Sequence, residues 1–152
     1  MRPLWHETFF DLADVWAKRA TCPRLKAGAV IVNPIARTVI TAGYTGAPYG
    51  LEHCTKVGCQ IVDGHCRRAL HAELNALLQA AREGRSVHGM VLYTQCRPCV
   101  ACLKALYQAG IDTVYYRQVK ETDAYAWEVY TQLGARGFRL MYVPPRKSEG
   151  GE

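Results

Sequence analysis

The sequence predicts a three-layer α/β/α sandwich, in which a five-stranded mixed sheet carries helices on both faces. Segments with helical periodicity alternate with short β-branched or apolar runs, in the order α-β-β-α-β-α-β-α-β. The chain has 152 residues, of which 49% are hydrophobic, enough to fill one sizeable core. We therefore expect a single domain over residues 1–147, followed by a flexible tail over residues 148–152.

The first half of the chain predicts one helix, a strand pair and a long loop. Residues 4–20 form an amphipathic pattern, with apolar side chains at helical spacing at Phe9, Leu12, Ala13 and Trp16. The β-branched runs 29–32 and 38–41 are typical of paired strands. The segment 43–68 is rich in Gly and Cys and is long for a loop in a compact domain. Such loops are usually functional or are held in place by another group.

The second half alternates helices with strands. The expected helices cover residues 70–83, 99–109 and 123–133, with Gly84 and Gly110 ending the first two and Asp123 as the N-cap of the third. The expected strands cover residues 90–94, 113–117 and 138–143. The last strand ends at the pair Pro144-Pro145.

Composition narrows the classes of protein that the chain can belong to. No stretch approaches the roughly 18 apolar residues of a membrane span, and the N-terminal segment lacks the apolar core of a signal peptide. We therefore expect a reducing, cytoplasmic setting. Seven Cys are unusual there unless some of them bind metal or do chemistry, and the odd count argues against a complete set of disulfides.

The net charge of +6 suits an anionic partner, either a nucleotide phosphate or a nucleic acid, although a basic surface without a partner explains it equally well. Lys and Arg are spread along the chain, and no block of five like charges occurs. We therefore do not expect a polybasic arm that binds nucleic acid.

Two short motifs carry the chemistry: His71-Ala72-Glu73 and Pro98-Cys99-Val100-Ala101-Cys102. One His and two Cys can close on a zinc ion, and three protein ligands leave a fourth position for water, as in catalytic zinc sites. Both motifs fall at expected helix starts, where the positive end of the helix favours thiolate over thiol. Glu73 is two positions from His71, so it points away from the metal and can move protons.

Each half of this set has a simpler explanation on its own. A lone His near a helix start is usually structural, and a lone Cys-x-x-Cys motif is typical of redox sites or of structural zinc. The two motifs occur together about 28 positions apart, which favours a catalytic zinc over both alternatives.

His-x-Glu combined with Pro-Cys-x-x-Cys is the signature of zinc-dependent nucleobase deaminases. Over residues 5–141, the chain resembles the deoxycytidylate (dCMP) deaminases of the cytidine deaminase-like superfamily. The motifs that carry this resemblance are Trp5-His6-Glu7-Thr8-Phe9, Ala27-Gly28-Ala29-Val30-Ile31-Val32, Gly43-Tyr44-Thr45-Gly46-Ala47-Pro48-Tyr49-Gly50-Leu51, His53-Cys54, Cys66-Arg67, His71-Ala72-Glu73-Leu74-Asn75-Ala76, Pro98-Cys99-Val100-Ala101-Cys102 and Gln108-Ala109-Gly110-Ile111. The first helix and the Gly-Tyr-x-Gly-x-Pro-x-Gly stretch point to the dCMP branch.

The resemblance implies hydrolytic removal of the amine at C4 of dCMP, giving dUMP and ammonia. In that case His71, Cys99 and Cys102 hold zinc and Glu73 is the proton shuttle. The resemblance also implies a homo-oligomer and, in some relatives, regulation by dCTP and dTTP.

The resemblance further assigns substrate contacts. The backbone at Ala72 and Pro98 lines the base pocket, and an aromatic residue near Tyr115 lies against the sugar or base. For Tyr115, a role in the core is at least as good an explanation.

The chain departs from the family pattern at two places. Thr45 replaces the usual Asn of Gly-Tyr-Asn-Gly, whose amide contacts the nucleotide, so this position is predicted to bind substrate. In Thr94-Gln95-Cys96-Arg97, the Thr stands one position earlier than usual and Arg97 lies beside the metal loop. Either change could alter substrate choice or remove regulation.

Some family members carry a second zinc, with ligands at positions that match Cys22 and Cys54; His65 or Cys66 could complete the set here. Such a site would tie down the long loop and contribute folding energy. The alternative is that these residues are ordinary thiols and a loop His.

Two other functions compete with dCMP deamination. The same chemistry could act on another aminated base, nucleoside or nucleotide. A polynucleotide substrate requires a basic groove with stacking aromatics, and it is not expected because the chain shows no concentrated basic segment. A zinc-stabilised binding protein without catalysis is the third hypothesis, but such a protein has no use for Glu73.

Overall fold

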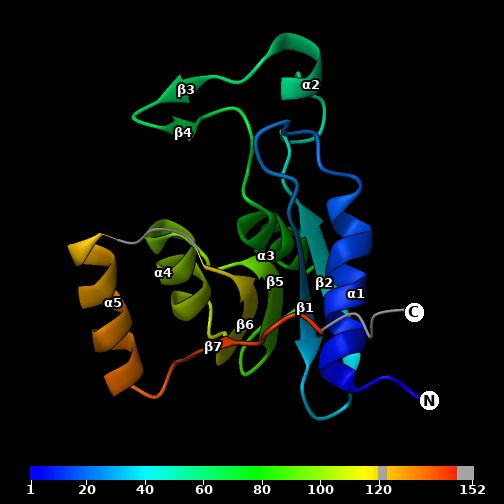
Figure 1. Ribbon diagram of the computed structural model, residues 1–152, viewed down its shortest axis with the longest axis vertical. Coiled ribbons are helices and arrows are strands. Elements are labelled where there is room, and N and C mark those ends of the chain that lie inside the picture. The colour runs from blue at the N-terminus through cyan, green and yellow to red at the C-terminus, as the bar shows by residue number, and fades with distance from the viewer. Residues whose placement is uncertain (120–122, 147–152) are drawn as a thin grey trace, which may run out of the picture.

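The computed structural model, which describes residues 1–119 and 123–146, confirms the expected sandwich (Figure 1). The main sheet has the order β2-β1-β5-β6-β7. Its strands are β1 (Gly28–Asn33), β2 (Thr38–Tyr44), β5 (Val91–Cys96), β6 (Thr113–Gln118) and β7 (Arg139–Tyr142). β1 pairs antiparallel with β2 and β5, whereas β5–β6 and β6–β7 are parallel. The sheet is therefore mixed, with β5 at its centre.

Helices cover both faces of this sheet. Helix α1 (Trp5–Ala17) packs on one face, and α3 (Ala72–Arg82), α4 (Val100–Gln108) and α5 (Ala124–Ala135) lie on the other (Figure 1). Strand alternation divides the core accordingly: on β5, Leu92 belongs to the cluster under α3 and α4, whereas Tyr93 belongs to the cluster under α1. None of the described helices has the length and apolar character needed to cross a membrane.

The segment expected to be one long loop contains regular structure. It holds the short helix α2 (Cys54–Val57) and a hairpin of β3 (Ile61–Val62) and β4 (His65–Cys66), which lies at the top of Figure 1. Strands of two residues are too short for an alternating pattern to reveal them. The turn, however, has φ values of 50° at Asp63 and 77° at Gly64, and an Asp-Gly pair is a strong hairpin signal that the sequence already carried.

The remaining elements lie where the sequence places them, with small shifts at their ends. The first helix ends at Ala17 rather than Ala20. β5 extends beyond Thr94 to Cys96, close to the predicted metal loop. Gly84 and Gly110 follow helix ends with φ values of 67° and 93°, as expected for residues that terminate helices in the left-handed region.

Two glycines allow helices to lie directly on the sheet. A Cβ atom on Gly28 would lie 2.0 Å from the carbonyl oxygen of Ala13 in α1. A Cβ atom on Gly43 would lie 2.4 Å from the backbone nitrogen of Ala76 in α3. Both approaches are closer than any side chain permits, so these positions fix the distances of α1 and α3 from the sheet.

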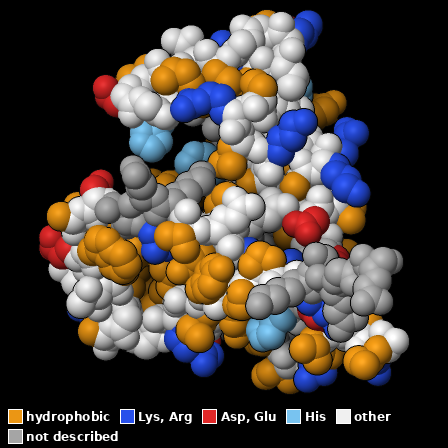
Figure 2. All heavy atoms as spheres, in the orientation of Figure 1, with side chains coloured by type: hydrophobic (Ala, Val, Ile, Leu, Met, Phe, Trp, Pro, Cys, Tyr) orange, Lys and Arg blue, Asp and Glu red, His pale blue; other side chains and the backbone are white. Residues whose placement is uncertain are grey.

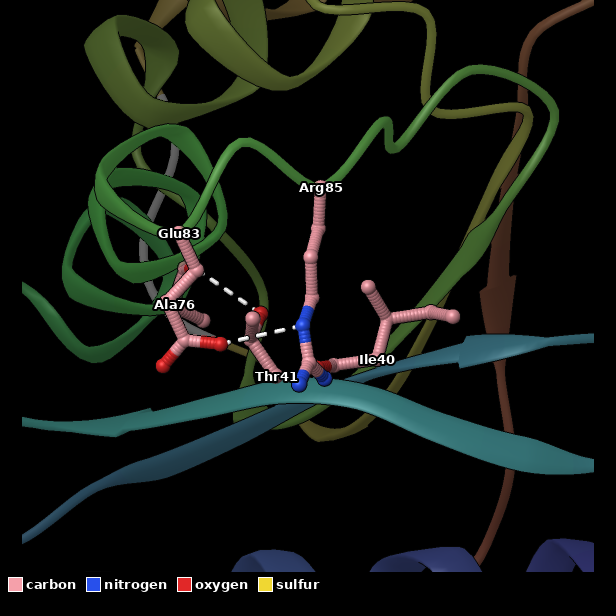
Figure 3. Close-up of polar contacts among 5 residues, drawn as sticks. All are labelled: Ile40, Thr41, Ala76, Glu83 and Arg85. Carbon is pink, nitrogen blue, oxygen red and sulfur yellow. Dashed lines mark hydrogen bonds and ion pairs between the residues drawn. The ribbon is translucent and has the colours of Figure 1, made fainter.

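Polar contacts fasten α3 to the edge strand β2 (Figure 3). The Thr41 hydroxyl donates to the carbonyl oxygen of Ala76 at 2.9 Å. After the helix ends, Arg85 donates to the carbonyl oxygen of Ile40 at 2.7 Å and pairs with Glu83 at 3.0 Å. These contacts, one within α3 and one just after its end, fix the helix on β2 and so help to position its N-terminus, which carries the first motif.

Candidate active site

Three metal-ligating atoms converge between the starts of two helices. His71 is the N-cap of α3 and Cys99 is the N-cap of α4, while Cys102 lies in the first turn of α4. The Nδ1 atom of His71 is 3.4 Å from the Sγ atoms of both Cys99 and Cys102. Tetrahedral zinc with bonds of about 2.0–2.3 Å places its ligand atoms roughly 3.3–3.8 Å apart. The donor atoms and their spacing therefore fit zinc.

The helix ends also prepare the sulfur atoms for a metal. A hydrogen bond from the Cys102 thiol, followed by contacts with His71 and a backbone N–H, lowers the pKa of Cys99 to about 3. Contact with Cys99 and burial raise the pKa of Cys102. These directions favour the thiolate form at Cys99, and zinc favours the thiolate form of both residues.

Glu73 lies next to this group but is buried, with 5% of its surface exposed. Burial raises the pKa of its carboxyl, while a hydrogen bond from Thr94 and the charge of His71 act in the opposite direction. The hydroxyl of Thr94 donates to Oε1 of Glu73 at 3.0 Å. A carboxyl held in this way is suited to exchange protons rather than to remain permanently ionised.

His71, Glu73 and Cys99 line a cavity of about 800 Å³. Three of the four residues predicted to contact substrate also line it: Thr45, Ala72 and Pro98. The β3–β4 hairpin contributes part of the wall, and Figure 2 shows the surface hollowed beneath it, with histidine side chains at the edge. The volume is sufficient for a nucleotide.

Arg97 supplies positive charge to the same cavity. It is 8% exposed, and its guanidinium carbon lies 5.3 Å and 5.4 Å from the ring centres of Trp127 and Tyr130 in α5. Its backbone N–H donates to Gln118 at 2.9 Å, and Tyr130 donates to the adjacent Pro98 carbonyl at 3.4 Å. Aromatic rings therefore hold the cation beside the metal loop.

Tyr115 is not brought to this cavity. Its ring stacks on Tyr93 at 4.8 Å and lies edge-on to His6 at 4.7 Å, under α1. Alternation along β6 explains this placement, because Tyr115 faces α1 while Tyr116 faces the helices that bear the site. Tyr115 is therefore half-buried against the core cluster under α1 and does not line the cavity, which fits the alternative that it has a role in the core.

A second group of sulfur atoms lies in the long loop, but its membership differs from the expected set. Cys54, Cys59 and Cys66 have their sulfur atoms within 4.8 Å of one another, and buried Cys22 packs with the same cluster. His65 is exposed and lines the active-site cavity instead. Adjacent residues of a strand point to opposite sides, so Cys66 and His65 cannot both face the cluster.

The sulfur cluster already favours a thiolate. Burial raises the pKa of the Cys66 thiol, but hydrogen bonds from the backbone of Ala69, Arg68 and Gln60 outweigh it and lower this pKa to about 6. Burial and the neighbouring thiols raise the pKa of Cys54 to about 12. This combination suits a group that shares a cation.

Sequence reasoning missed several residues of the cavity. Asp123, Ala126 and Tyr130 line it from α5, and their spacing of three and then four positions places them on one helix face. That periodicity could have identified the face, but not its distance from the metal loop. The sequence showed that Thr94 stands one position earlier than in the family pattern, but it did not indicate that Thr94 contacts Glu73.

Comparison with known proteins agrees with this geometry. Residues 3–118 match the family described as "Cytidine and deoxycytidylate deaminase zinc-binding region". The chain belongs to this family. Its members bind zinc through the region that contains the two motifs.

The chain is 42% identical to ComE operon protein 2 of Bacillus subtilis, over 86% of this chain and 68% of that protein. It is 35% identical to the deoxycytidylate deaminase of Schizosaccharomyces pombe, over 97% of this chain but only 47% of the yeast enzyme. Among solved structures, it resembles the dCMP deaminase of cyanophage S-TIM5 in complex with dCMP and dUMP. That match has a TM-score of 0.77 and 30% identity, and it covers 94% of this chain and 99% of the phage chain.

Proposed function

We propose that this deaminase removes the amine at C4 of dCMP by hydrolysis, giving dUMP and ammonia. The observation that carries the proposal is the buried Glu73 beside a His-Cys-Cys set spaced for zinc, in a cavity large enough for a nucleotide. The phage relative, which covers nearly the same length, is a dCMP deaminase in complex with dCMP and dUMP.

His71, Cys99 and Cys102 are proposed to hold the zinc ion. A zinc ion held there would act as a Lewis acid and make water a nucleophile near neutral pH. Glu73 takes a proton from the attacking water and delivers it to N3 of the ring. It then carries the second proton of that water to the amine, and the C4–N bond breaks as ammonia leaves. Both protons of the water are thereby accounted for.

Charge at the cavity supports an anionic substrate. Arg24 and Arg97 line its wall together with the backbone of the metal loop, and the chain carries a net charge of +6. A nucleoside monophosphate offers these guanidinium groups a phosphate to pair with, whereas a free nucleoside does not. Thr45, buried in the same wall, is proposed to contact the nucleotide.

A second zinc is proposed on the loop cluster, with Cys59 in place of His65 beside Cys22, Cys54 and Cys66. We also propose a cytoplasmic location, which the seven free cysteines favour. Assembly into a homo-oligomer is proposed on the strength of exposed apolar side chains around the edge strand and the long loop, among them Val39, Tyr49 and Leu51.

The test is a substrate panel. The purified, zinc-loaded chain is incubated with dCMP, CMP, dCTP, deoxycytidine, cytosine and guanine, and ammonia release is measured. We expect the highest kcat/KM for dCMP, with deoxycytidine far behind. Equal rates for deoxycytidine would remove the phosphate from recognition, and preference for another aminated base would overturn the substrate assignment.

A further inference from the structure

We propose that Thr94 is a positioning residue of this active site, whose hydroxyl fixes the orientation of the Glu73 carboxylate. The inference rests on the proposed function, because it assigns a task to Glu73. Its basis is a buried contact: the Thr94 hydroxyl donates to Oε1 of Glu73 at 3.0 Å, and Thr94 has no exposed surface.

Strand geometry makes this contact a property of the fold. Thr94 lies on β5, the central strand, and pairs with Ala29 of β1. Leu92 and Thr94 point to the same face because they are two positions apart, and that face carries α3. β5 ends at Cys96, two residues before Pro98-Cys99. The same strand, β5, therefore positions both the Thr94 hydroxyl that contacts Glu73 and the start of the loop that carries Cys99.

A threonine at this position is not explained by packing. A valine has nearly the same shape and suits the centre of a buried strand better, because it has no hydroxyl to satisfy. A buried hydroxyl needs a partner, and among the described residues its side-chain partner is the Glu73 carboxylate.

The hydroxyl donates to Oε1 of the carboxylate, which also accepts a hydrogen bond from the backbone of Glu73. A hydroxyl rotates, so it can donate to Oε1 whether or not the second oxygen carries a proton. The carboxyl group can thus gain and lose a proton without turning. Loss of this contact removes the side-chain restraint on the last torsion of Glu73, which is broad for a Glu side chain.

The experiment compares Thr94→Val, Thr94→Ser and the wild type. Because proton transfer depends on placement within a fraction of an ångström, we expect Thr94→Val to lower kcat about ten- to hundred-fold, with KM changed by less than about two-fold. Thr94→Ser keeps the hydroxyl and is expected to recover most of the lost kcat. Zinc content should stay at the wild-type value in both variants.

The matched control is Thr113→Val. Thr113 is also fully buried on a strand of the same sheet, but its hydroxyl contacts Asp112 at 3.4 Å rather than the active site. We expect wild-type kcat for this variant. A loss of kcat in Thr113→Val equal to that in Thr94→Val would show that any buried threonine behaves alike and would overturn the inference.

A readout without metal or turnover completes the test. In crystals of the metal-free protein, the wild type should show one Glu73 conformation with Oε1 about 3.0 Å from Thr94 Oγ1, and Thr94→Val should show several conformations or a displaced one. Unchanged Glu73 in Thr94→Val, or a Thr94→Ser variant as slow as Thr94→Val, contradicts the proposal. Failure of the wild type to release ammonia from dCMP instead contradicts the proposed substrate, and the Thr94 comparison then uses whichever aminated base the wild type accepts.

Discussion

At the scale of single residues, the site depends on the placement of one carboxyl group beside a cation site. Glu73 is buried within α3, and the charged ligand set begins two residues earlier at His71. The positive ends of α3 and α4 meet here, which favours both thiolates and an ionisable carboxyl. Small changes at Glu73 should therefore separate chemistry from metal binding.

Glu73→Gln should abolish turnover while zinc remains bound. The amide keeps the shape and can still accept from Thr94, but it cannot carry a proton. We expect kcat to fall at least about 10²- to 10⁴-fold, the range that a general acid–base contributes. Ammonia release and zinc content by atomic absorption check this, with exposed Glu128→Gln as the control. Surviving activity would mean that another group moves the protons.

The stability of the metal-free protein should depend on pH through the same residue. Burial raises the pKa of Glu73, so the folded chain holds this proton more tightly than the unfolded chain does. The stability of the wild type relative to Glu73→Gln should therefore fall as pH rises above about 4.3, the unfolded pKa of Glu, and level off above the folded pKa. Urea unfolding of both proteins at several pH values, with a chelator present, measures the difference. A difference that does not change with pH contradicts the assignment.

Thr45→Asn should change nucleotide preference without changing zinc content. Thr45 is buried in the cavity wall and its hydroxyl lies 3.4 Å from the carbonyl oxygen of Ala27. An amide at this position is longer and offers both a donor and an acceptor. We expect altered KM values for dCMP and CMP, measured by steady-state kinetics. Identical kinetics would remove Thr45 from the pocket.

Residue types and spacing predict which side chains can bind metal, but they do not predict which side chains contact one another across the core. His71, Cys99 and Cys102 could be grouped from their types and spacing, and the structure brings them together. Thr94 could not be linked to Glu73, because their contact joins β5 to α3 across the core. The sequence left His65 and Cys66 as alternatives for the second site for a similar reason: the choice between them depends on the phase of a strand of only two residues.

At the scale of elements, the site is positioned by close packing of helices on the sheet. Gly28 and Gly43 leave no room for a side chain against α1 and α3. Hydrophobic periodicity predicted both helices. Their short distance from the sheet depends on Gly28 and Gly43, which have no Cβ atom, and periodicity does not reveal this. The β3–β4 hairpin went unpredicted because its strands are shorter than the pattern that identifies strands.

Gly43→Ala should displace α3 and weaken the fold. The new methyl group would lie 2.4 Å from the backbone nitrogen of Ala76, and backbone cannot yield as a flexible side chain can. We expect the free energy of unfolding to fall by about 2 kcal/mol or more. Because α3 carries His71 and Glu73, turnover should fall as well. Denaturant unfolding and kinetics report the two effects.

Gly134→Ala is the matched control for that variant. Gly134 lies within α5, and a Cβ atom there meets nothing within 4 Å. Alanine in a helix is favoured over glycine, so we expect a gain of about 0.5–1 kcal/mol. If both variants lost stability to the same extent, packing against α3 would not be the cause.

At the scale of the whole molecule, two groups of candidate metal ligands have different places in the fold. The His-Cys-Cys set joins two helix starts, and the sulfur cluster holds the loop whose hairpin forms part of the cavity wall. The extent of the domain over residues 1–147 stays a prediction, and the tail expected over residues 148–152 lies outside the described residues. The layer order of the sandwich was predictable because it follows from the sequence of elements alone.

Metal content tests both groups. We expect two zinc ions per chain in the wild type and one in Cys59→Ser, with a lower Tm because the long loop loses its tie. His65→Ala should keep both ions, since that side chain is exposed and faces the cavity. Mass spectrometry under native conditions and thermal unfolding measure these quantities. One zinc per wild-type chain would end the idea of a structural site.

The most direct test of the account is the location of the metal. Crystals of the purified chain are measured at wavelengths on either side of the zinc absorption edge, which identifies the element and its position. The account predicts an anomalous peak bounded by Nδ1 of His71 and the sulfur atoms of Cys99 and Cys102, with the Glu73 carboxyl next to it. Well-ordered side chains in zinc-replete crystals with no peak between them would contradict it.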